Sequence, residues 1–318
     1  MLFNPDLPTI RHAAELLASF LPVTRTVSAP SLARDGSPVY LKLEIELPTG
    51  SFKPRGAIYA LATNLKQRKI AEVTASSTGN HGAAVAYAAK VLGVPATIFL
   101  PANPNPVKRA KIRDLGAKIV ESGAGDLAQA FQDAAEYSRR PGVYFLNDAT
   151  DADLPAGPAT IGLEISQQVP QASTIYVPMG DTALIRGLAA AAKQLIPGVR
   201  IVGVQAERAP SYYLSWKQGS VVPTDTCDTC ADGLATRTPE VENVEMIHEV
   251  VDDVVLVSEE QMLGAIRHLY QEERIVAEPA GGAATAAFLA SPVRSGSTVL
   301  LVSGANISQD VRQQAGIA

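Results

Sequence analysis

Lys53 is the residue whose surroundings best suit covalent chemistry. It lies in residues 47–57, which read LPTGSFKPRGA, between an extended run at 39–44 and a helical pattern at 55–68. Pro54 suits the first turn of that helix, because a proline there loses no hydrogen bond. We therefore expect Lys53 at a strand-to-helix turn, where packing can desolvate its amine and make it nucleophilic. On this spacing alone, a surface lysine with a solvated charge is the alternative.

Two further turns carry small and hydroxyl-bearing residues where a predicted strand meets a predicted helix. Residues 76–82 read SSTGNHG, so backbone N–H groups could hold a carboxylate while Asn80 bonds a ring oxygen. Residues 179–187 read MGDTALIRG, and the free N–H groups at such a helix start favour an anion. Thr182 could add a hydroxyl donor, whereas we expect Asp181 to turn away and cap the helix. Ordinary helix starts without a ligand are the alternative for both turns.

Small residues also fill the turns at 278–282 (EPAGG) and 303–306 (SGAN). None of these turns has the G-x-G-x-x-G fingerprint of a dinucleotide site, and none ends in Gly-Lys-Ser/Thr as a phosphate loop does. A nucleotide cofactor is therefore not indicated. Because open α/β sheets bind ligands where strands end and helices begin, these turns predict a small-molecule site.

The elements that must position these turns alternate along the chain. Strands are predicted at 39–44, 72–76, 96–101, 118–122, 143–147, 173–179, 200–205 and 298–303. Helices are predicted at 9–20, 55–68, 81–92, 106–115, 126–138, 159–168, 183–195, 210–217, 258–273 and 279–290, with a last helix from near Asn306. Residues 23–32 and 221–242 are expected to be loops, and Ser51 and Ser258 are expected to cap helices.

This alternation defines the fold class. Strands separated by single helices form parallel sheets covered on both faces, so we expect an α/β protein with two open parallel-type sheets. We expect residues 48–147 to form a small α/β domain, and residues 1–47 and 148–318 to form a large domain.

Composition excludes several classes of partner. The chain has 318 residues and a net charge of −5, so it presents no excess of basic residues for nucleic acid or anionic membrane. No apolar run is long enough to span a membrane, and the first residues lack the basic start and apolar core of a signal peptide. We expect a soluble, cytoplasmic protein.

The cysteines, Cys227 and Cys230, form a C-x-x-C pair. They are too few for a disulfide framework, and no second pair completes a structural zinc site. Two incidental thiols in a loop are favoured over metal binding or redox chemistry.

In sequence order, the motifs S-F-K-x-R-G-A, S-T-G-N-H-G, the Gly-started turn before L-x-x-G, A-D-G, E-P-A-G and S-G-x-N resemble those of the fold-type-II pyridoxal-phosphate enzymes. The resemblance is nearest to the serine/threonine dehydratase group, which includes threonine ammonia-lyase and serine racemase, and it covers nearly the whole chain. It implies a fold like that of the tryptophan synthase β subunit, with pyridoxal 5'-phosphate between two lobes, and a homodimer.

The resemblance also implies roles for matching residues. Lys53 matches the lysine to which the cofactor is attached and which later acts as base, and Thr78 matches a serine acid/base of the racemases. The implied cofactor-binding residues are Phe52, Lys53, Asn80, Gly180, Asp181, Thr182, Ala183, Leu184, Gly233, Glu278 and Ser303. The implied residues for the substrate carboxylate are Ser77, Thr78, Gly79, Asn80 and His81.

The implied activity is an ammonia-lyase reaction: β-elimination from serine or threonine to give a 2-oxo acid and ammonia. Ser303 matches the residue at the pyridine nitrogen, where a serine cannot hold a proton as an aspartate would, and this suits β-elimination. The alternatives are β- or γ-replacement, as in cysteine synthase or threonine synthase, racemisation, and a catalytically silent cofactor-binding relative. Residues 205–211 lack the particular carboxylates that bind a divalent ion in racemase-like members, so we expect no metal. No regulatory domain follows the core in this sequence, and we expect no end-product feedback of the biosynthetic type.

Overall fold

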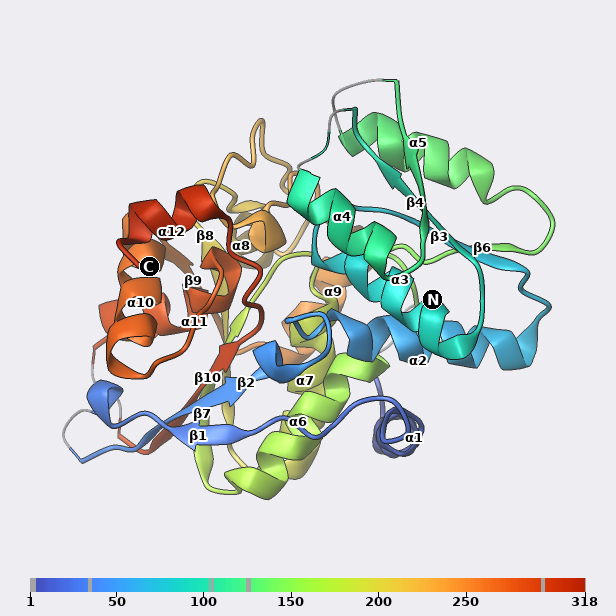
Figure 1. Ribbon diagram of the computed structural model, residues 1–318. Helices are drawn as coiled ribbons and strands as arrows, with labels where there is room; N and C mark the ends of the chain where they lie inside the picture. Colours follow the sequence, from blue (N-terminus) through green and yellow to red (C-terminus); the bar gives the residue numbers. More distant parts are fainter. Residues whose placement is uncertain are drawn as a thin grey trace.

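The computed structural model describes residues 4–317 except 34–35, 103, 105, 124–126 and 293–294. Its strands form two separate sheets that lie side by side, each with helices packed against it (Figure 1). The α/β class expected from the alternating pattern is confirmed. The division into domains at residues 48–147 stays a prediction.

The larger sheet has the strand order β1-β2-β10-β7-β8-β9. Neighbouring strands of this sheet run parallel, except that β1 pairs antiparallel with β2. The strands are β1 (Thr26–Ser28), β2 (Val39–Leu43), β7 (Ala172–Pro178), β8 (Arg200–Ala206), β9 (Asp253–Val257) and β10 (Ser297–Val302). The pairing of β2 with β10 brings the chain's early residues against its last strand.

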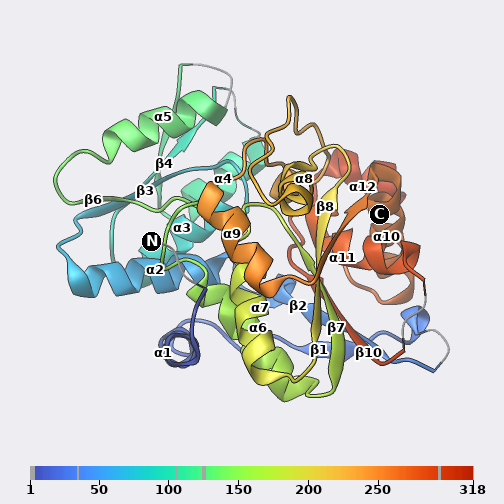
Figure 2. The same cartoon turned by 180° about the vertical axis from the view of Figure 1, so that it is seen from behind.

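Helices cover both faces of this sheet because its strands are apolar on both sides. Along β10, Val299 and Leu301 pack towards α6 (Ala156–Gln168), α7 (Ala183–Leu195) and α9 (Val241–Val250). Leu300 and Val302 pack towards α10 (Glu259–Glu272) and α11 (Pro279–Ala290) on the opposite face. Figure 2 shows α7 and α9 from behind, with α10 and α11 beyond the sheet. Successive side chains of β10 point to opposite faces of the sheet, so they belong to two separate apolar clusters.

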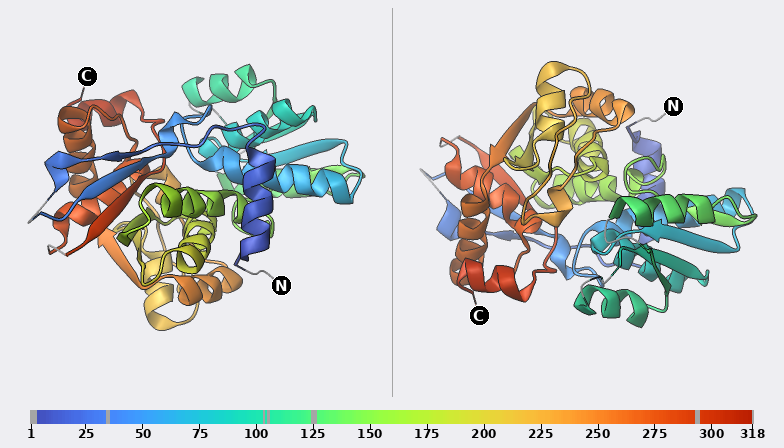
Figure 3. Two further views of the ribbon diagram at one scale, coloured as in Figure 1. Left: turned by 90° about the horizontal axis from the view of Figure 1, so that it is seen from below. Right: turned by 90° about the horizontal axis from the view of Figure 1, so that it is seen from above.

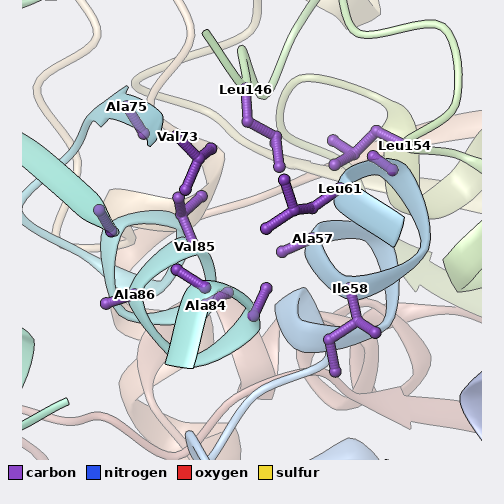
Figure 4. Packing of buried hydrophobic residues seen from close by; sticks show 14 of the residues in the cluster. Ala57, Ile58, Leu61, Val73, Ala75, Ala84, Val85, Ala86, Leu146 and Leu154 are labelled. Atoms are coloured by element: carbon purple, nitrogen blue, oxygen red, sulfur yellow. The ribbon is translucent and has the colours of Figure 1, made fainter. Parts of the chain in front are cut away.

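The smaller sheet is parallel throughout, in the order β5-β4-β3-β6. Its strands are β3 (Glu72–Ser76), β4 (Ala96–Leu100), β5 (Lys118–Glu121) and β6 (Val143–Phe145). On one face Val73 of β3 packs against Leu61 of α2 (Lys53–Gln67) and Val85 of α3 (Asn80–Leu92), as Figure 4 shows. On the other face Phe99 packs against α5 (Leu127–Tyr137). This packing fixes the starts of α2 and α3, where Lys53 and Asn80 lie.

The remaining helices are α1 (Leu7–Leu17), α4 (Pro106–Asp114), α8 (Ser211–Gln218) and α12 (Gln309–Ala315), with 3-10 turns η1 (Pro30–Leu32), η2 (Glu44–Glu46) and η3 (Asp232–Leu234). Both views of Figure 3 place α1 beside α2. At the other end of the chain, α12 packs against α10, on the opposite face of the larger sheet from α6 and α7.

Some predicted elements were wrong. The predicted loop at 23–32 contains the edge strand β1, which is too short to show a period. The predicted loop at 221–242 contains η3 and the start of α9, and β9 was missed. The last helix begins at Gln309 after a Ser308 cap, not near Asn306. The predicted start of α5 at Asp126 lies outside the described residues.

The predicted caps had opposite outcomes. Ser258 caps α10 in a reciprocal capping box with Gln261, as expected. Ser51 does not cap α2: the cap position is Phe52, which makes no side-chain cap bond. Ser51 instead forms a β-bridge with Gly304, so the backbone before α2 lies beside the residues that follow β10.

Candidate active site

A cavity of about 590 Å³ lies where turns from both sheets meet. All the site residues predicted from the sequence line it: Phe52, Lys53, Ser77, Thr78, Gly79, Asn80, His81, Gly180, Asp181, Thr182, Ala183, Leu184, Gly233, Glu278 and Ser303. Several of these follow β3, β7 and β10, which belong to different sheets. The turns predicted to carry chemistry therefore surround one space.

Lys53 begins α2 and directs its amine into this cavity. Its side chain is 18% exposed, and its Nζ forms an ion pair with Asp148. The same nitrogen lies 5.2 Å from the centre of the Phe52 ring. The backbone N–H of Phe52 donates to the Ser303 carbonyl at 3.0 Å, which ties the turn to the larger sheet. The surface-lysine alternative is therefore wrong.

Asp148 was not among the predicted site residues, although it also lines the cavity. Its other carboxylate oxygen lies 3.5 Å from His81 Nδ1, and His81 Nε2 lies 2.9 Å from the Leu146 carbonyl. Burial alone would raise the pKa of Asp148, but the charge of Lys53 and a contribution from His81 outweigh burial and lower it. The sequence did contain a signal for Asp148: it follows the predicted strand at 143–147, which in the structure is β6, a parallel neighbour of β3. Residues after parallel strands lie at the same edge of a sheet, so Asp148 lies near residues 76–82.

The start of α7 forms a narrow turn. A Cβ added to Gly180 would lie 2.2 Å from the Gly233 carbonyl oxygen, so only glycine allows the two backbones to approach. Thr182 has φ +66°, an unusual conformation for a β-branched residue. Its buried hydroxyl has no hydrogen-bond partner among the residues that the structure describes. Strained backbone and an unpartnered hydroxyl at a helix start are features of a ligand site.

Asp181 does not cap α7, contrary to expectation, because Thr182 occupies the cap position and makes no side-chain cap bond. The Asp181 carboxylate instead accepts a hydrogen bond from the Thr236 hydroxyl at 2.9 Å. Burial, and next the negative charge of Asp148, raise the pKa of Asp181. The Asp181 carboxylate therefore does not occupy the backbone N–H groups of the turn, one of which, that of Ala183, donates to the Asp181 carbonyl at 2.9 Å.

Hydrogen bonds connect the remaining turns across the cavity. The Asn80 amide donates to Glu278 Oε1 at 2.6 Å, and the Asn306 amide donates to Asn80 Oδ1 at 2.6 Å. Gly304 lies close to this pair, since a Cβ there would lie 2.1 Å from Glu278 Oε1 and the Glu278 side chain would have to move. Ser303 is buried, and its hydroxyl donates weakly to the Ala280 carbonyl at 3.4 Å.

The residues around this cavity fit pyridoxal 5'-phosphate. The amine of Lys53 can bond an aldehyde, and the glycine-dependent turn with the unpartnered Thr182 hydroxyl suits a phosphate. Asn80 and Ser303, on opposite turns, offer polar groups for the substituents of a ring.

Other candidate sites are less supported. Within the part of the chain that is described, no cluster of His, Cys, Asp and Glu could hold a metal ion. Cys227 and Cys230 are free and half-buried at the cavity wall. Burial, together with a hydrogen bond to Glu259, raises the pKa of Cys230 to about 12, so its thiol stays protonated. No helix among the described residues has both the length and the apolar character needed to cross a membrane.

Comparisons with known proteins agree with this geometry. Residues 19–304 match the family described as pyridoxal-phosphate dependent enzyme. An L-threonine ammonia-lyase of Geobacter sulfurreducens is 38% identical over 274 residues, which cover 86% of this chain and 68% of that protein. An L-threonine dehydratase catabolic TdcB of Staphylococcus aureus is 34% identical over 284 residues, covering 88% and 81%. The structure of maize serine racemase superposes with a TM-score of 0.91 at 28% identity, covering 99% of this chain and 97% of the other.

The family match covers most of the chain, and the relatives are those of the serine/threonine dehydratase group that the motifs resemble. The fold neighbour shares the same two-sheet α/β architecture over nearly its full length. The chain belongs to the family of pyridoxal-phosphate dependent enzymes.

Proposed function

We propose that this protein is a pyridoxal-phosphate-dependent ammonia-lyase that eliminates the β-hydroxyl group of threonine or serine, giving a 2-oxo acid and ammonia. The observation that carries the proposal is the amine of Lys53, held by Asp148 inside a cavity where the helix-start turns of both sheets meet. Relatives named as threonine ammonia-lyase and dehydratase support the reaction class.

In this proposal different cavity residues bind different parts of the cofactor. Lys53 attaches its aldehyde carbon, and Phe52 packs beside its ring. The turn Gly180, Asp181, Thr182, Ala183 and Leu184 receives the phosphate, with the Thr182 hydroxyl as one donor. Asn80 would bond the ring hydroxyl, Ser303 would face the pyridine nitrogen, and Gly233 and Glu278 would line the ring. When bound, the cofactor supplies an electron sink for the α-carbon of the substrate.

The protein residues supply positioning and proton transfer. The N–H and hydroxyl groups of Ser77, Thr78, Gly79, Asn80 and His81 orient the substrate carboxylate. The amine of Lys53, once released, removes the α-proton, and the Asp148 carboxylate keeps that amine directed into the cavity. The hydroxyl of Thr78 faces the opposite side of the substrate. The hydroxyl of Ser303 cannot hold a proton at the ring nitrogen as a carboxylate would, so the bound cofactor would be a milder electron sink, which suits departure of the β-hydroxyl.

A substrate panel tests the proposal. The protein loaded with pyridoxal phosphate should release 2-oxo acid from threonine or serine alone. Release that requires sulfide and an activated serine would indicate replacement, exchange of α-protons without release would indicate racemisation, and binding without turnover would indicate a silent relative. Each of these outcomes would contradict the lyase proposal.

The variant Lys53→Ala tests the attachment site. It should lose the absorbance band of the lysine-bound cofactor together with turnover. Lys90→Ala is the matched control, because Lys90 is exposed on α3 and does not line the cavity. An unchanged spectrum in Lys53→Ala would show that the cofactor is attached elsewhere.

Three predictions from the sequence accompany this function. We propose a homodimer, a cytoplasmic location, and a small domain of residues 48–147 set against a large domain of residues 1–47 and 148–318. Sedimentation of the loaded protein would test the first of these.

A further inference from the structure

Lys111 is a cation of the cavity wall that the proposed cofactor contacts do not use. It lies on α4, is half-buried, and lines the cavity. Its amine donates to the Thr49 carbonyl at 2.8 Å and to Asn306 Oδ1 at 2.6 Å. An ammonium has three N–H donors, so one is left to point elsewhere.

The partners of Lys111 are neutral oxygens. Among the residues that the structure describes, no ion pair joins Lys111 to a carboxylate. Burial lowers the pKa of Lys111, and the charge of Glu278 acts against that effect. A half-buried ammonium held by neutral acceptors beside a cavity is a receptor for an anion that enters the cavity.

The turn at residues 77–81 lacks a cation that is free to take this role. His81 is buried, with Nε2 near the Leu146 carbonyl and Nδ1 near Asp148. Among the described residues that line the cavity, Lys53 is the other lysine, and the cofactor occupies it in the proposed function. The wall also contains Asp148 and Asp181, whose charges repel an incoming carboxylate.

Lys111 is positioned next to that same turn. Its amine contacts Asn306, and Asn306 in turn donates to Asn80. The adjacent Ile112 would lie 3.2 Å from a Cβ on Gly82, in the first turn of α3. Thus α4 packs directly against the helix start that presents the neutral donors.

We infer that Lys111 binds the α-carboxylate of the substrate, adding the positive charge that residues 77–81 lack. The site then selects amino acids over the corresponding amides and amines. This inference rests on the proposed function only in taking an amino acid as the substrate.

The test compares a ligand with and without the carboxylate. L-Alanine and L-alaninamide, neither of which has a β-leaving group, are titrated calorimetrically into the cofactor-loaded protein. In Lys111→Met, alanine should bind about 10- to 100-fold more weakly, while alaninamide binding should change less than about twofold. Lys111→Arg should keep the preference for alanine. Lys90→Met, which removes an exposed lysine of α3, should behave as the wild type.

Several results would overturn the inference. An equal loss for alanine and alaninamide in Lys111→Met would show that Lys111 only supports the fold. Unchanged binding of both would show that no carboxylate reaches it. If L-aspartate is titrated as a third ligand, weaker binding of aspartate alone in Lys111→Met would place Lys111 at a side-chain carboxylate and contradict the inference. If the alanine pattern appears but no β-hydroxy amino acid yields a 2-oxo acid, the proposed function fails and this inference stands.

Discussion

The variant Arg55→Met should strongly destabilise the protein, because Arg55 holds together a buried cluster of charges behind Lys53. Its side chain is 2% exposed. It donates to both oxygens of Glu44, at 2.7 and 3.0 Å, and to both oxygens of Glu164, at 2.6 and 2.9 Å. Lys42, 2.5 Å from Glu164, is the second cation. These contacts join α2 to η2 and α6.

The expected magnitude follows from the charges. Removing Arg55 leaves two buried carboxylates, Glu44 and Glu164, facing the single ammonium of Lys42. Breaking a buried ion pair in this way typically costs about 3–5 kcal/mol. Protonation limits the loss, because neutralising a glutamate of usual pKa 4.5 at pH 7 costs about 3 kcal/mol. We therefore expect the free energy of unfolding at pH 7 to fall by about 3–4 kcal/mol.

The pH dependence gives a second check. Burial opposes, but Arg55 and Lys42 outweigh it, so the pKa of Glu164 is lowered in the folded protein. A lowered carboxylate pKa stabilises the fold above the unfolded pKa, and this contribution is lost as pH falls through the folded pKa. In the variant, the single ammonium of Lys42 faces two buried carboxylates, so burial raises the pKa of a glutamate there above the usual 4.5. A raised carboxylate pKa destabilises the fold progressively as pH rises above the unfolded pKa, which adds to the variant's deficit at pH 7 but not at pH 4.5. The difference between variant and wild type should therefore shrink as pH falls from 7 towards about 4.5.

Urea unfolding followed by circular dichroism at pH 7 and at pH 4.5 measures both quantities. Arg113→Met is the matched control, because the Arg113 side chain is 60% exposed and its ion pair is with the neighbouring Asp114, at 3.4 Å. The stability of this variant should hardly differ from that of the wild type. A loss below about 1 kcal/mol for Arg55→Met at pH 7, or a loss that does not depend on pH, would refute the reasoning.

Three further variants test the cofactor cavity. Thr182→Val keeps the side-chain volume but removes the unpartnered hydroxyl, so pyridoxal phosphate should bind about tenfold more weakly in a fluorescence titration of the apoprotein; equal affinity would argue against a hydroxyl contact. The raised pKa of Asp181 means that its ionisation disfavours the fold as pH rises above its usual 3.8, so Asp181→Asn should raise the thermal midpoint more at pH 7 than at pH 4, and a uniform shift would contradict this. Ser303→Asp should favour protonation of the ring and alter the ratio of elimination to side reactions; an unchanged product ratio would show that residue 303 is not at the nitrogen.

Local sequence patterns determined most of the elements of this protein. The alternation of short apolar runs with helical runs predicted the strands of the smaller sheet, and an amphipathic period of 3.6 residues predicted helices such as α1 and α7. Pro54 placed the start of α2 near Lys53, and Ser258 placed the start of α10. Short or unpatterned elements were not predicted: β1 has three residues and is recognised as a strand by its antiparallel pairing with β2.

Only the tertiary structure decided which groups meet. Asp148 reaches Lys53 from 95 positions along the chain, and Asn80 reaches Glu278 from 198 positions away. Asp181 bonds Thr236 instead of its own helix, and Lys111 joins Asn306 across the cavity. Such pairs depend on strand order and on how two sheets are set against each other. No local period encodes either property, since they result from burying several apolar faces at once.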